Sequence, residues 1–117
     1  MSREIKFRAW DKVNKIMTYN SINAINFDGQ ILLNDGKFHD INKTDYILMQ
    51  YTGFVDINGI KIFEGDVVHI SGIGNYIVKD IRKDFDMLVN AIVEGDLNEI
   101  VGNIYKNPEL ITEVKNV

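Results

Sequence analysis

The sequence predicts a mainly β fold, made of short antiparallel strands with little helix. Short apolar or alternating runs recur along the 117 residues, and Asp-Gly or Asn-Gly pairs separate several of them. Both kinds of pair tolerate the positive φ angles of tight hairpin turns. Strands that recur at short spacing between such turns indicate a sandwich or a small barrel. We expect a small SH3-like or pseudo-barrel core and an N-terminal β-hairpin region.

The expected elements follow in chain order. Residues 4–9 alternate apolar side chains with Lys6 and Arg8, which is typical of a half-buried strand with a basic outer face. After a turn at 11–15 the chain returns through 16–19, and an Asp28-Gly29 hairpin joins the next two strands. A polar stretch at 42–45 predicts a short helical turn, and Pro108 opens a C-terminal turn. The remaining strands are expected at 22–27, 30–34, 37–41, 46–52, 66–70, 75–81 and 99–105.

Residues 85–93 fit two templates. Phe85, Leu88, Val89 and Ile92 have the i, i+3, i+4, i+7 spacing of an amphipathic helix, and every second residue from Phe85 to Val93 is apolar, as in a strand. Because the surrounding pattern is β, we favour a strand.

Composition predicts one soluble domain over residues 1–117, with an N-terminal β region at 1–45 and a barrel-like region at 46–117. The chain has no cysteine, so disulfides, thiolate nucleophiles and Cys-ligated zinc are excluded. No run approaches the roughly 20 apolar residues of a membrane span, and the charged start is unlike a secretion signal. We expect a cytoplasmic protein without a cofactor.

Charge is unevenly distributed along the chain. Residues 1–20 hold five basic and two acidic side chains, and residues 80–117 hold four basic and eight acidic ones. A basic strip with an aromatic side chain suits nucleic acid, so its candidate binding residues are Arg3, Lys6, Arg8 and Trp10. The net charge of −4 and a pI near 5.1 argue against a nucleic-acid surface over the whole protein. We favour the alternative, in which the basic end of the chain lies against its acidic end or these charges form solvated faces.

The segment from Asp56 to Gly59 resembles the start of a calcium loop, but its spacing excludes one. A calcium-binding EF-hand loop needs glycine at position 6 and glutamate at position 12. Counting from Asp56, these positions hold Lys61 and Val67. We therefore interpret Asp56, Asn58 and Gly59 as turn residues.

Glu64 and Asp66 are two carboxylates separated by one glycine. Such a pair could act as general acid and base if burial raised one pKa. The simpler interpretation is a turn in which Gly65 supplies an unusual backbone angle and Asp66 accepts backbone N–H groups. We favour the turn.

No other pattern indicates catalysis or metal binding. His39 and His69 lie 30 residues apart without ligand spacing, and the serines have neither a nucleophile-elbow context nor an adjacent base. We therefore expect no enzyme and no metal. Five tyrosines, six phenylalanines and Trp10 favour protein–protein contact, as a homo-oligomer or with another protein.

Four segments follow in order along the chain: residues 3–11 (REIKFRAWD), 49–53 (MQYTG), 56–68 and 102–110 (GNIYKNPEL). Together they resemble a known family of small proteins, the YopX family. The family usually has Gln-Tyr-Thr-Gly-Leu and Ile-Tyr-Glu-Gly-Asp, where this chain has Phe54 and Phe63 in place of the Leu and Tyr. Residues 20–45 and 71–98 match loosely.

The resemblance implies a bacteriophage or prophage origin and action inside the infected bacterium, where a protein partner would be a host or phage protein. It also implies a mainly β domain with a small barrel-like part. It implies no activity, because the family has no established biochemical function and no catalytic residues to carry over.

Overall fold

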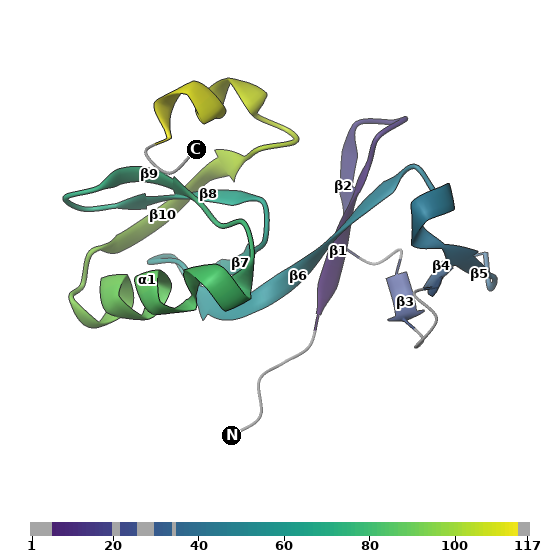
Figure 1. Ribbon diagram of the computed structural model, residues 1–117, viewed down its shortest axis with the longest axis horizontal. Helices are drawn as coiled ribbons and strands as arrows, with labels where there is room; N and C mark the ends of the chain where they lie inside the picture. The colour runs from purple at the N-terminus through teal and green to yellow at the C-terminus, as the bar shows by residue number, and fades with distance from the viewer. Residues whose placement is uncertain (1–5, 20–21, 26–29, 34, 115–117) are drawn as a thin grey trace. The chain divides into compact units, whose positions relative to one another are not determined.

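The computed structural model describes residues 6–19, 22–25, 30–33 and 35–114 (Figure 1). The described chain forms two compact units, one over residues 6–50 and one from residue 51 onward. Strand β6 (Tyr46–Val55) begins in the first unit and ends in the second. The single domain over residues 1–117, with regions at 1–45 and 46–117, stays a prediction.

The first unit is made of two antiparallel sheets. In one, β1 lies between β2 and the first half of β6, and in the other β4 lies between β3 and β5. Asp40 caps a short 3-10 helix, η1 (Ile41–Lys43), by accepting the N–H of Asn42. The predicted Asp28-Gly29 turn lies outside the described residues. The strands are β1 (Phe7–Asp11), β2 (Ile16–Thr18), β3 (Ile22–Ile25), β4 (Gln30–Leu33) and β5 (Phe38–Asp40).

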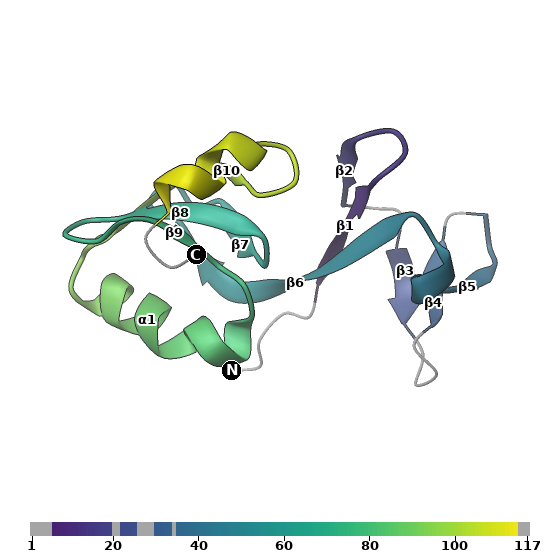
Figure 2. The same ribbon diagram turned by 45° about the horizontal axis from the view of Figure 1, so that its top comes forward.

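The second unit is an antiparallel sheet with a helix on one side. The three-stranded sheet has the order β10-β8-β9, and the end of β6 pairs with β7. Helix α1 lies on one side of this sheet and the 3-10 helix η2 on the other (Figures 1 and 2). The elements are β7 (Lys61–Phe63), β8 (Asp66–Ile70), β9 (Gly74–Ile77), α1 (Ile81–Val93), β10 (Leu97–Asn103) and η2 (Pro108–Glu113).

The mainly β fold class is confirmed, since most elements of the described residues are antiparallel strands, with one α-helix among them. The core of the second unit lies between α1 and the sheet. Apolar side chains from both fill it, and burying them is the main favourable contribution to folding. Its buried members are Ile62, Val68, Ile70, Val78, Ile81, Leu88, Ala91 and Leu97.

The strand predicted at residues 85–93 is wrong, because these residues belong to α1. The reason lies just outside the ambiguous segment. Asp80 caps the first turn by accepting the N–H of Arg82 at 2.9 Å. At the other end Gly95 has a φ of +75°, and the N–H of Asp96 bonds to the carbonyl of Ala91. This pairing is the Schellman ending of a helix, so the two caps select the helical template.

Among the described residues, no helix has the length and apolar character needed to cross a membrane.

Leu88 is fully buried in this core. Leu88→Ala is expected to lower the free energy of unfolding by about 2–5 kcal/mol, because the substitution leaves a cavity between α1 and the sheet. Urea unfolding followed by circular dichroism measures the loss. The matched control is Asn90→Ala on the exposed side of the same helix, expected within about 0.5 kcal/mol of the wild type. Equal losses in both variants would contradict the packing described for α1.

Candidate functional site

The turn between β6 and β7 is held by one buried carboxylate. Asp56 is 6% exposed, and its Oδ1 accepts the N–H groups of Asn58 and Ile60, each at 2.9 Å. Its Oδ2 accepts the N–H of Ile100, in β10, at 3.0 Å. One side chain therefore shapes the turn and fastens it to a strand 44 residues further along the chain.

Backbone bonds close the same turn. The N–H of Asp56 donates to the carbonyl of Ile60 at 2.8 Å, and the N–H of Gly59 donates to the carbonyl of Asp56 at 3.0 Å. Gly59 has a φ of +79°, a conformation that glycine adopts without a steric penalty. A further bond joins the N–H of Ile57 to the carbonyl of Asn98 at 3.2 Å. The turn is thus fixed both within itself and against β10.

Two opposing effects set the pKa of the Asp56 carboxyl. Burial disfavours the charged form and is the largest single effect, raising the pKa. The N–H groups of Ile100, Ile60 and Asn58 favour the charged form. Together these three bonds outweigh burial, so the pKa of Asp56 lies below its ordinary value of 3.8.

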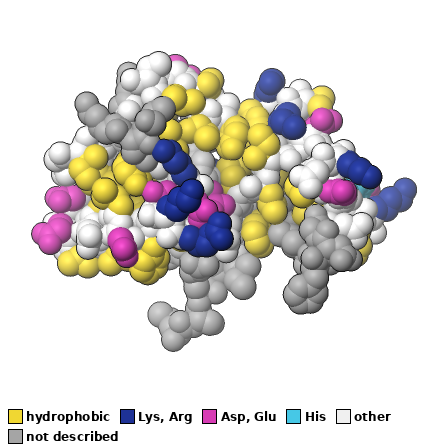
Figure 3. Space-filling view, viewed as in Figure 1, with side chains coloured by type: hydrophobic (Ala, Val, Ile, Leu, Met, Phe, Trp, Pro, Cys, Tyr) yellow, Lys and Arg dark blue, Asp and Glu magenta, His cyan; other side chains and the backbone are white. Residues whose placement is uncertain are grey.

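This fixed turn presents apolar side chains to solvent. Ile57 is 66% exposed and Ile60 is 57% exposed, and Val55 just before the turn is also exposed. We call Val55, Ile57 and Ile60 the apolar tip. Hydrophobic side chains reach the surface at several places (Figure 3). Hydrogen bonds to Asp56 and Asn98 fix the backbone that carries Ile57 and Ile60.

The segment from Glu64 to Asp66 forms a turn into β8. Gly65 has a φ of +91°, and the Asp66 carboxylate, in a residue only 2% exposed, accepts the N–H of Phe63 at 2.8 Å. Glu64 is half-buried. Arg82 has a raised pKa, caused first by its hydrogen bond to Asp80, then by the charge of Asp80, and with a smaller contribution from the charge of Glu64.

The predicted basic strip does not form an exposed face. Arg3 lies outside the described residues, Lys6 is half-buried, and Arg8 and Trp10 are 3% and 6% exposed. The expected basic outer face of this strand is therefore wrong at Arg8. Its guanidinium is directed at Tyr19, with Nη1 3.4 Å from the hydroxyl and the carbon centre 6.0 Å from the ring centroid. An arginine stem packs well on apolar surface, and an aromatic ring attracts its charge.

The two histidines lie in different units. His39 Nε2 is 3.0 Å from Asp35 Oδ2, and His69 Nδ1 is 2.9 Å from Asn98 Nδ2, which also donates to Ser71 Oγ. Within the part of the chain that the structure describes, no group of three or more His, Cys, Asp or Glu side chains could hold a metal ion.

Comparison with known proteins supports the family resemblance of the sequence. A family model described as YopX protein matches residues 6–112. The chain belongs to the YopX family. Among solved structures, it is similar to protein EF1440 from Enterococcus faecalis, with a TM-score of 0.58 and 22% identity over 94% of this chain and 99% of that one. This second likeness shows a shared fold alone. Comparison with curated protein sequences gives no match.

Asp56→Ala is expected to lower the free energy of unfolding at neutral pH by about 2–3 kcal/mol, because three backbone N–H groups lose a charged acceptor. The pKa of Asp56 is lower in the folded state than in the unfolded chain. The stabilisation is therefore complete above the unfolded value and is lost as pH falls through the folded one.

Urea unfolding of the wild type and of Asp56→Ala, repeated from about pH 6 down to about pH 2, tests the predicted direction in which the stabilisation changes with pH. The stability difference should narrow at the acidic end. Glu99→Ala, which removes an exposed carboxylate from β10, is the control and is expected to change little at either pH. A difference that is constant with pH would show that the Asp56 charge does not hold the turn.

Proposed function

We propose that this protein is a phage or prophage accessory protein that acts by contact with other proteins and with copies of itself, without catalysing a reaction. Its place of action would be the cytoplasm of the infected bacterium. Membership of the YopX family supports the phage origin. The apolar tip is the observation that carries the contact role.

The apolar tip has the properties of a preorganised contact surface. Ile57 and Ile60 expose apolar area that would be removed from water in a complex, which favours association. Ordering a flexible loop on binding costs free energy, and this turn is already ordered by Asp56 and by the bond to Asn98. A protein partner therefore gains the apolar contact without having to fix the loop.

The buried acidic groups support a role without catalysis, because they serve the fold. Asp84 accepts the Tyr76 hydroxyl at 2.6 Å and the N–H groups of Lys79 and Asp80 at 2.8 and 3.1 Å. Asp56 and Asp66 likewise accept backbone N–H groups. A general acid or base needs a carboxyl that can reach a substrate proton, and these three are directed at the protein's own donors.

Nucleic-acid binding through the N-terminal strip has less support. A base-stacking platform needs an exposed aromatic side chain beside exposed cations. Trp10 and Arg8 are both buried, and the net charge of the chain is −4.

Photo-crosslinking in cells tests the contact role of the tip. A photoreactive amino acid placed at Ile57 is expected to give discrete crosslinked protein species in bacteria that express the chain during phage infection. Val13 is the matched control, since it also lies in a turn and is 65% exposed, close to the 66% of Ile57. The same amino acid at Val13 should give none of these species.

The same bands from both positions, or no bands from position 57, would contradict a contact role for the tip. Binding of the purified protein to DNA or RNA, with affinity that falls as salt rises, would favour the nucleic-acid alternative instead.

A further inference from the structure

Helix α1 exposes apolar side chains to solvent in addition to those that it packs into the core of the second unit. Ile81 and Leu88 face the core of the second unit, and yet Phe85 is 46% exposed and Val93 is 75% exposed. Residues four apart lie on one helical row. One such row of α1 is apolar throughout: Ile81, Phe85, Val89 and Val93.

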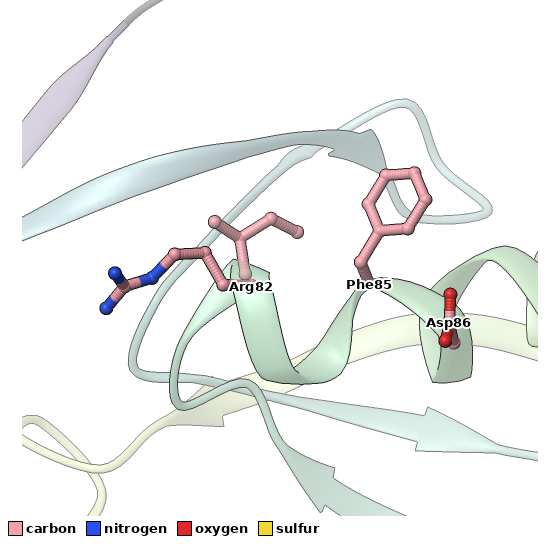
Figure 4. A pocket seen from close by; sticks show the side chains of 4 residues that line it. Arg82, Phe85 and Asp86 are labelled. Carbon is pink, nitrogen blue, oxygen red and sulfur yellow. The ribbon is translucent and has the colours of Figure 1, made fainter.

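A hollow opens beside this row near the start of the helix. It has a volume of about 440 Å³ and is lined by Ile81, Arg82, Phe85 and Asp86. In Figure 4 the Phe85 side chain points away from α1, with Arg82 on one side of it and Asp86 on the other. The ring centroid of Phe85 lies 5.6 Å from that of Phe54, a residue of β6. The lining of the hollow thus combines two apolar side chains with one positive and one negative side chain.

The two charged side chains that line the hollow have groups available to bind a partner. Arg82 binds Asp80 through Nε and Nη2, at 3.2 and 2.9 Å, while no hydrogen bond to a described residue uses its Nη1. The Arg82 side chain is 87% exposed. Asp86 is exposed, and its carboxylate has no partner among the residues that the structure describes. Arg82 and Asp86 lie one helical turn apart, about 6 Å along the axis.

This arrangement is complementary to itself. When two such helices cross in opposite directions near Phe85, a two-fold axis places Arg82 of each copy against Asp86 of the other. The Phe85 rings then meet over the two hollows, as aromatic pairs do at interfaces. A parallel crossing would instead set Arg82 against Arg82 and Asp86 against Asp86, so charge selects the antiparallel one.

The apolar row also fits the commonest way in which helices pack. Rows of residues four apart interdigitate when two helices cross at about −50°. Phe85, Val89 and Val93 provide such a row, and the row beside it begins with Arg82 and Asp86. The contact therefore has an apolar centre and a charged rim, the usual anatomy of a protein interface.

We propose that α1 is a self-association surface, at which a second copy of this chain docks antiparallel across a two-fold axis at Phe85. This inference rests on the proposed function, in which the protein contacts copies of itself, and it names the surface and the partner. The interface is isologous, so each residue contact occurs twice.

Two charge reversals test the pairing. Arg82→Glu and Asp86→Arg each convert both ion pairs into like-charge contacts, so each variant alone is expected to self-associate at least about tenfold more weakly than the wild type. When the two variants are mixed, one ion pair keeps its native polarity and the other is restored with reversed polarity. The mixture should therefore form a heterodimer with near wild-type affinity, measured by sedimentation velocity.

Lys83→Glu is the matched control, because it makes the same charge change one residue away without lining the hollow. It should leave the dissociation constant within about twofold of the wild type. Circular dichroism melts of each variant show whether the fold is kept. Rescue in the mixture cannot come from a variant that fails to fold, so the mixed sample tests the pairing even if one reversal is destabilising.

The outcomes separate this inference from the proposed function. A wild-type oligomer that neither reversal weakens, or reversed variants that do not associate on mixing, overturns the α1 surface and leaves the contact role standing. A wild-type monomer at all concentrations overturns the α1 surface as well. The proposed function falls with it if the photo-crosslinks from Ile57 are also absent.

Discussion

The second unit depends on the ionised carboxylate of Asp56. Its two oxygens hold the turn between β6 and β7 through Asn58 and Ile60, and they fasten that turn to β10 through Ile100. A hairpin of two short strands is marginally stable by itself, so this bond across the chain matters more than a local turn contact would. With the hairpin fixed, Phe54 is held where it supports the ring of Phe85 on α1. One buried charge therefore holds the apolar tip and helps to place Phe54 beside α1.

Charged residues in this protein mostly serve structure. Asp56, Asp66, Asp80 and Asp84 accept backbone N–H groups at turns and at the start of α1, while Arg8 is directed at an aromatic ring inside its own unit. Such groups stabilise a small fold that has no disulfide to constrain it. The exposed surface also includes large apolar side chains, and on α1 Arg82 and Asp86 form a pair of opposite charges beside Phe85. That combination favours protein partners over polyanions.

Local sequence patterns predict part of the fold and part of the candidate site. The mainly β class and most strands follow from the alternation of apolar and polar residues and from the Asp-Gly and Asn-Gly pairs. The sequence also predicts a turn at Asp56, Asn58 and Gly59, because Asx side chains bond to nearby N–H groups. The bond from Asp56 to Ile100 spans 44 residues and leaves no local pattern. Helix α1 was missed because residues 85–93 satisfy both periodicities, although Asp80 and Gly95 at its ends carried the deciding cap signals. The burial of Arg8 depends on Tyr19 folding over it, which alternation within one strand cannot reveal.

The central claim is that the exposed apolar face of α1 is a surface at which the protein associates with a second copy of itself. The most direct measurement is a dilution series of the wild-type protein followed by two-dimensional amide NMR. Concentration-dependent shifts should gather on α1 around Arg82, Phe85 and Asp86, while the amides of β1 stay unchanged. Shifts that are absent at every concentration, or that gather on β1 instead of α1, would contradict the account.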